Sequence, residues 1–291
     1  MKSNALTSAR PDVDDSALPT MDEPYVPPPA EGPRAKMKPI GFGEPFRWLD
    51  RGWKDLINQP AIALFYGVSF FLMAHILALV FKYKPEFTLS MISGCLLIGP
   101  FLAMGLYEVS RRKEMGAQPD LSSSLTCWDA HIPSMAMLIL VLMVLELLWG
   151  RASLIVFAVF FNTGMPSTTG VLEAVFNPQN IEFVMVYLAV GSFFAVLVYG
   201  LSVVSIPMIL DRDTDAISAV LTSMRVVFSN LAVMLLWGFM LSVLVFGALW
   251  PWGVGIILVG PWLGHASWHA YRGSVEWEEG VQEAVTLGSS N

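Results

Sequence analysis

Charged side chains are scarce in this 291-residue chain, where Asp, Glu, Lys and Arg together make up 14% of the residues. A soluble globular domain carries roughly 25%. Here hydrophobic residues make up 55% and the mean hydropathy is +0.58. This composition excludes a typical cytosolic enzyme and a disordered protein. The net charge of -7 gives no overall attraction to polyanions, so no nucleic-acid partner is expected.

Cysteine is nearly absent, and the common catalytic motifs are missing. Two cysteines, Cys95 and Cys127, cannot form the framework of a disulfide-rich scaffold. The sequence contains no G-x-x-x-x-G-K-[ST], no G-x-G-x-x-G, no G-x-S-x-G and no C-x-x-C. The missing motifs argue against an enzyme without deciding the question, and they predict no cofactor.

Long apolar segments dominate the rest of the chain. A membrane-spanning helix needs about 20 predominantly apolar residues, and a helix satisfies its own backbone hydrogen bonds in hydrocarbon. We predict an all-α membrane protein with six transmembrane helices, so that the lipid bilayer is its first partner. The expected spans are at about residues 60–82, 88–108, 134–161, 183–210, 231–250 and 252–270.

The two ends of the chain are polar. Residues 1–45 hold about half of the nineteen prolines together with many acids, and they have too little apolar surface to offset the entropy of ordering. No signal peptide is expected, because no apolar stretch follows the first residues. We predict a disordered Pro-rich cytoplasmic tail over 1–45, a six-helix domain over 46–272 and an acidic cytoplasmic tail over 273–291.

Most of the seventeen Lys and Arg residues fall on one side of the predicted spans. They precede the first span, lie between the second and third and between the fourth and fifth, or follow the sixth. Cytoplasmic loops of membrane proteins carry such an excess, so both termini are predicted to be cytoplasmic. The opposite side receives the loop at 162–182, which has no Lys or Arg.

Each pair of spans follows a shorter segment whose apolar residues share one helical face. The spacing i, i+3, i+4, i+7 is clear in 45–58 and 213–230 and weaker in 119–132. The second span of each pair contains a proline, namely Pro100, Pro207 and Pro261. We predict three tandem hairpins, each preceded by a short amphipathic helix on the inner interface. The prolines either bend helices around a cavity or serve packing alone.

Ionisable residues inside a membrane are costly and are therefore candidates for function. Glu146 falls roughly 18 Å into the third span, and Arg151 follows it about 140° around the helix. Glu146 is predicted either to relay protons or bind a cation, or to be a protonated acid bonded to a neighbouring helix. His75 in the first span is either a lone haem ligand or a packed side chain.

His265 and His269 lie at i and i+4 near the inner end of the sixth span, so their imidazoles share one face. A metal would need one or two further ligands, and Glu108 and Asp211 are the candidates at similar depth. The alternatives are hydrogen bonding at the interface and a role in proton transfer. Haem or metal binding is therefore one hypothesis for this pair.

Two stretches resemble a family of bacterial integral membrane proteins of unknown function. They are Ile206-Pro207 with 211–217, and the Gly-Pro-Trp-Leu-Gly-His-Ala-Ser-Trp-His-Ala-Tyr-Arg run at 260–272. The likeness covers roughly residues 40–272, and it assigns no catalytic residue because the family has no established activity. Some members carry the label of a cytochrome c oxidase subunit. The four histidines of this chain are too few for a haem–copper catalytic subunit, so the label would fit an accessory or assembly role.

The sequence therefore predicts a multi-pass protein of the bacterial inner membrane. Its expected role is that of a non-catalytic accessory, scaffold or assembly factor of a membrane complex, for which a respiratory oxidase is one possibility. The expected partners are the bilayer and subunits of that complex. Two alternatives stay open: a small-solute or proton-coupled transporter that uses Glu146, and a haem- or metal-binding membrane protein that uses His265 and His269.

Overall fold

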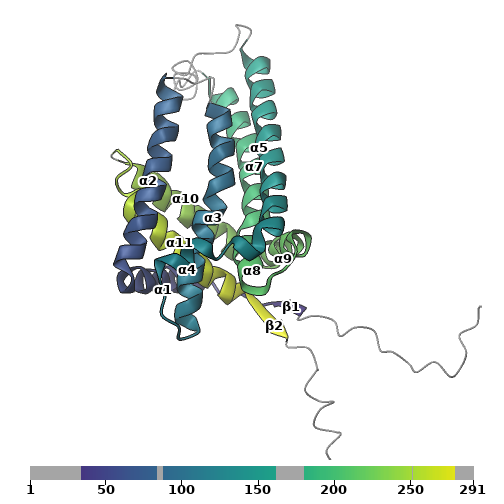
Figure 1. Cartoon of the computed structure of the whole chain (residues 1–291). Helices are drawn as coiled ribbons and strands as arrows, with labels where there is room; N and C mark the ends of the chain where they lie inside the picture. The colour runs from purple at the N-terminus through teal and green to yellow at the C-terminus, as the bar shows by residue number, and fades with distance from the viewer. Residues whose placement is uncertain (1–33, 84–87, 162–179, 251, 279–291) are drawn as a thin grey trace, which may run out of the picture. The chain divides into compact units, whose positions relative to one another are not determined.

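Long helices make up most of the structure, a computed structural model that describes residues 34–83, 88–161, 180–250 and 252–278 (Figure 1). For residues 88–97 it describes the backbone only. The long helices within these ranges follow the six predicted spans in order. They are α2 (Pro60–Tyr83), α3 (Thr88–Glu114), α5 (Ile132–Phe160), α7 (Ile181–Ser202), α10 (Leu231–Leu249) and α11 (Ile256–Ser274).

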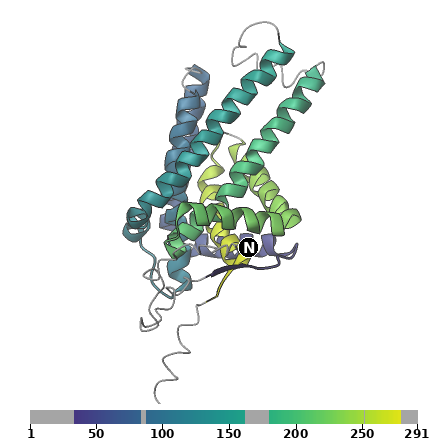
Figure 2. The ribbon, with the colours of Figure 1, turned by 90° about the vertical axis from the view of Figure 1, so that its right-hand side faces the viewer.

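The predicted amphipathic segments are also helical. The helix α1 (Glu44–Asn58) precedes α2, and α9 (Ala216–Ser229) precedes α10. Ahead of α5 lie α4 (Leu121–Thr126) and a 3-10 turn, η3 (Asp129–His131). A short helix followed by two long helices thus occurs three times in the described chain, with a further short helix, α8 (Ser205–Arg212), between α7 and α9. Figure 2 shows the short helices gathered at one end of the long ones, which we call the short-helix end.

Four segments of the described chain are long and apolar enough to cross a membrane. They are Pro60–Tyr83, Leu121–Phe160, Ile181–Arg212 and Leu231–Leu249. Most residues in the apolar window of each segment are not buried by the rest of the protein, as expected for helices surrounded by hydrocarbon. The helices α3 and α11 are not among the four, so the count of six spans stays a prediction.

The fourth predicted span is broken into two helices. After α7 ends at Ser202, a two-residue turn leads into α8 (Ser205–Arg212). Pro207 lies in the first turn of α8, where its missing N–H is tolerated, whereas it would interrupt a continuous helix. The backbone N–H of Val204 in the turn donates to Ser223 Oγ of α9 (3.2 Å). This contact satisfies a donor that the break leaves without a helical partner.

The second long helix of each pair contacts a short helix. Ser124 Oγ of α4 donates to the Gly105 carbonyl of α3 (2.7 Å), and Ser223 Oγ of α9 donates to the Gly200 carbonyl of α7 (2.6 Å). The last long helix, α11, packs against α1, where Trp262 Nε1 donates to a backbone carbonyl (2.8 Å). At the short-helix end, each of the first two pairs of long helices is therefore linked to the short helix of the next pair, and the last pair is linked back to α1.

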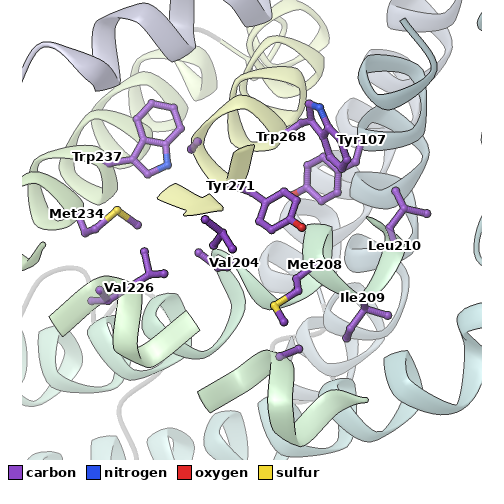
Figure 3. Packing of buried hydrophobic residues seen from close by; sticks show 14 of the residues in the cluster. Tyr107, Val204, Met208, Ile209, Leu210, Val226, Met234, Trp237, Trp268 and Tyr271 are labelled. Carbon is purple, nitrogen blue, oxygen red and sulfur yellow. The ribbon is translucent and has the colours of Figure 1, made fainter. Parts of the chain in front are cut away.

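The main hydrophobic core also lies at the short-helix end. Figure 3 shows part of it, with Trp237 of α10 and Met234 on one side and Trp268 and Tyr271 of α11 on the other. The Trp237 ring meets the Trp48 ring of α1 edge to face, with 5.5 Å between the centroids. Burial is thus concentrated where short and long helices meet.

Ordered structure extends past the predicted domain boundaries at 45 and 273. The strand β1 (Arg34–Met37) pairs with β2 (Val275–Glu278), and the Ile40 N–H donates to Asn230 Oδ1 (2.9 Å). These contacts join segments far apart in the sequence, which local composition does not reveal. Of the tails predicted over 1–45 and 273–291, residues 1–33 and 279–291 lie outside the described residues, as does most of the predicted outer loop.

Candidate functional site

A polar cluster at the short-helix end begins with Asp55. The buried residues of α1 are spaced by three or four along one face, and Asp55 follows Trp48 by seven residues, which is two helical turns. Gly52 between them allows close packing, because a Cβ there would lie only 2.8 Å from the Ala266 Cα of α11. Asp55 is consequently 5% exposed and faces α3 and α11.

Three side chains donate hydrogen bonds to Asp55. Ser110 Oγ (2.7 Å) and Lys113 Nζ (2.7 Å) belong to α3, and His269 Nε2 (2.8 Å) belongs to α11. Burial alone would raise the pKa of Asp55, but the hydrogen bonds from His269, Lys113 and Ser110 outweigh it and lower the pKa below its usual value. Asp55 is therefore a buried carboxylate that joins three helices.

His269 lies between two carboxylates. Its Nε2 donates to Asp55, and its Nδ1 is 3.5 Å from Glu114 Oε1. Glu114 also pairs with Arg272 Nε (3.1 Å). Since both ring nitrogens face negative charge, an imidazolium with a proton on each nitrogen fits this position.

His265 is fully buried on the far side of Ser110, with 2.8 Å between its Nδ1 and Ser110 Oγ. The hydroxyl proton of Ser110 goes to the Asp55 carboxylate, so Nδ1 is assigned as the donor to the hydroxyl oxygen. The Nε2 lone pair of His265 then has no partner among the described residues. A chain of contacts thus runs from Glu114 through His269, Asp55 and Ser110 to His265.

A cavity of about 260 Å³ opens beside the cluster. Several of its charged side chains form ion pairs: Lys113 of α3 pairs with Asp55, and Lys54 pairs with Asp50 within α1 (2.6 Å). The pairs that Asp55 makes with Lys113 and His269 link α1 to α3 and α11. The cavity is lined by Arg51, Lys54, Asp55, Ser110, Lys113, Glu114 and His269.

The other two predicted metal ligands have partners of their own. Glu108 accepts hydrogen bonds from two arginines of α3 (2.9 and 2.7 Å), and Asp211 accepts one from Tyr271 Oη (2.8 Å). Among the described residues, neither carboxylate forms a hydrogen bond or ion pair with His265 or His269. The described residues contain no group of three or more His, Cys, Asp and Glu side chains that could hold a metal ion. The metal site stays a prediction.

The three predicted intramembrane residues lie apart from the cluster. Glu146 lines a groove of about 450 Å³ between α5 and α7. Arg151 is exposed, and no recorded contact in the described chain pairs it with Glu146, in keeping with their predicted separation around the helix. His75 packs against Phe71, with 4.5 Å between the ring centroids.

Sequence reasoning found the two histidines but missed Asp55, Ser110 and Lys113 as their partners. The apolar spacing in 45–58 did not mark Asp55, which lies on the helical face of Trp48 and Gly52 and away from that of Phe46 and Trp53. No signal marks Ser110 either, because its partners come from helices distant in the sequence.

The fold defines a multi-pass integral membrane protein with a buried polar cluster at one end of its helices. A family described as "Predicted integral membrane protein (DUF2189)" has a model that matches residues 87–211. The match runs from α3 to α8, and it confirms the resemblance to a membrane-protein family of unknown function. No curated protein and no solved structure matches the chain.

The free energy of unfolding is expected to fall when the pH drops below about 4. The folded-state pKa of Asp55 is lowered from an unfolded value of about 3.9. Its contribution to stability is therefore complete above that value and is lost as the pH falls toward the folded-state pKa. Thermal melting in detergent across acidic and neutral pH measures the effect. Asp55→Asn should show a weaker acid dependence, and an unchanged dependence would contradict this assignment.

Proposed function

We propose that this protein is a non-catalytic accessory, scaffold or assembly factor of a membrane complex. One observation carries the proposal: Arg151 lies exposed on an uncovered apolar face of α5. That face includes Leu140, Val144, Leu147 and Leu154, which recur at helical spacing and are all exposed. Arg151 lies about 7.5 Å beyond Glu146 along α5, and an arginine within a membrane helix costs up to about 2.5–3.5 kcal/mol on insertion scales. A partner helix that brings hydrogen-bond acceptors would offset this cost.

We also infer six spans, with α3 and α11 completing the set. The threefold order of short, long and long helix supports three tandem hairpins that all run in the same direction. The contacts agree with this interpretation, because α3 and α7 each accept a serine hydrogen bond from a following short helix, whereas α11 returns to α1.

The same layout supports an inner-membrane orientation with both termini in the cytoplasm. Basic residues end the helices that reach the short-helix end: Arg111, Arg112 and Lys113 in α3, Arg212 in α8 and Arg272 in α11. An excess of Lys and Arg marks the cytoplasmic side. We therefore place the short-helix end in the cytoplasm of a bacterial cell.

A respiratory oxidase is one complex that this protein could serve. The support is the oxidase-subunit label carried by some proteins that the sequence resembles. Because the chain has four histidines, the proposal is limited to an accessory or assembly role.

Purification in a mild detergent tests the scaffold proposal. The parent protein is expected to co-purify with other membrane subunits, and Arg151→Gln is expected to lose them while it keeps the parent's melting temperature. Arg225→Gln is the matched control, because Arg225 is exposed on the short helix α9. Recovery of the parent as a lone protomer, or an intact complex with Arg151→Gln, would count against the proposal.

A second candidate function, a carrier of small solutes or protons, is favoured by the groove that contains Glu146. Flux through proteoliposomes should decrease in Glu146→Gln if the residue lies on the pathway. Absence of flux in the parent, or equal flux in the variant, would remove this candidate.

A further inference from the structure

The groove between α5 and α7 is built by two facing stripes of side chains. From α5 come Glu146 and, one turn later, Trp149. From α7 comes a stripe at spacing i, i+3, i+4, i+7, formed by Gly191, Phe194, Ala195 and Val198. The volume of about 450 Å³ lies within the range of small-molecule sites, roughly 300–1,000 Å³.

Aromatic side chains share the lining of the groove with Glu146. The centroid of the Trp149 ring is 5.8 Å from that of Phe194, and the Tyr199 side chain also lines the groove. Gly191 leaves room for the indole, because a Cβ there would lie 3.2 Å from the ring of Trp149. Tyr199 Oη already donates to a backbone carbonyl of α10 (2.7 Å). Of the described residues that line the groove, Glu146 alone is ionisable near neutral pH.

The chemistry of this lining selects one class of ligand. A hard inorganic cation such as Mg²⁺ or Ca²⁺ needs six or so oxygen ligands, whereas the groove offers a single carboxyl among apolar side chains. An anion would be repelled by the carboxylate. A neutral apolar molecule would leave the carboxylate without a counter-charge. An organic cation can pair with Glu146, interact with the aromatic faces and bury its apolar body.

We propose that this groove binds a lipophilic organic cation that enters from the bilayer. The ligand class is an amine or onium ion with an aromatic or alkyl body. This inference deepens the carrier hypothesis by naming the class of ligand at its site. It does not depend on the scaffold hypothesis, which rests on Arg151 on another face of α5.

Equilibrium binding of tetraphenylphosphonium to the purified full-length protein in detergent tests the proposal. The parent is expected to bind the cation saturably. Glu146→Gln is expected to bind at least about tenfold more weakly, because it loses a desolvated charge interaction. Glu182→Gln removes an exposed carboxyl in the first turn of α7 and should bind like the parent. Melting temperatures show whether each variant is folded.

Two further measurements separate the contribution of the Glu146 charge to binding from the contribution of the shape of the groove. Ala195→Leu fills the groove without altering Glu146 and should also weaken binding. Triphenylphosphine oxide, a neutral probe of similar shape, should bind weakly and equally to the parent and to Glu146→Gln. The proposal is overturned by equal affinity of the parent and Glu146→Gln for the cation, by equal affinity of the parent for both probes, or by absence of saturable binding. This assay measures binding and not transport. A failure of the flux assay would therefore remove the carrier hypothesis without deciding whether the groove binds the cation.

Discussion

Asp55→Ala is expected to lower the free energy of unfolding by about 3–5 kcal/mol, because removal of one partner of a buried ion pair leaves the other partner uncompensated. Ser110, Lys113 and His269 would all lose the acceptor that they share. The helix α1 would lose its polar link to α3 and α11. The melting temperature of the purified protein in detergent measures this loss.

Asp50→Ala is the matched control for this prediction, since it removes a carboxylate from the same helix. Asp50 pairs with Lys54, but their side chains are 59% and 62% exposed. Exposed ion pairs contribute only about 0–1 kcal/mol, so this variant should melt close to the parent. If the two variants melted alike, Asp55 would not be the link between the helices.

Gly67→Ala is expected to be comparably damaging, because α2 and α11 touch at this glycine. A Cβ at position 67 would overlap the backbone carbonyl oxygen of Ile257, and a backbone atom cannot rotate away as a flexible side chain can. Overpacking typically costs about 1–3 kcal/mol and occasionally more. We expect the upper end of this range, measured as a lower melting temperature and a lower yield of folded protein.

Gly247→Ala in α10 provides the same substitution without the obstacle. Nothing lies within 4 Å of the position that its Cβ would take, and alanine has a higher helix propensity than glycine. This variant should melt at or slightly above the parent's temperature. Equal behaviour of the two alanine variants would contradict the close packing of α2 against α11.

The long helices were predictable because their signal is local. The expected segments at 60–82 and 231–250 nearly coincide with α2 and α10, since each is a long run of residues with high mean hydropathy and few charged side chains. The break at Val204 was not predictable in the same way. It depends on Pro207, which the sequence shows, and also on Ser223, whose hydroxyl only the tertiary structure brings to the break.

The site was predictable only in part, for a similar physical reason. The i, i+4 spacing of His265 and His269 correctly indicated two imidazoles on one helical face, because helix geometry fixes that relation. Their partners come from α1 and α3, and no spacing rule connects Asp55 to a histidine more than two hundred residues later. The candidates Glu108 and Asp211 were chosen by depth alone, and depth does not specify the direction in which a side chain points.

Six crossings with both termini in the cytoplasm can be tested by site-specific labelling of intact cells. Single cysteines would replace Gln118, which is exposed after α3, and Trp250, which is exposed at the end of α10, in a variant whose two native cysteines are changed to alanine. A membrane-impermeant maleimide is expected to label position 250 directly. Position 118 and tags at both termini should become accessible only after permeabilisation of the inner membrane. Labelling of both cysteines from the same side, or termini on opposite sides, would contradict the six-span topology.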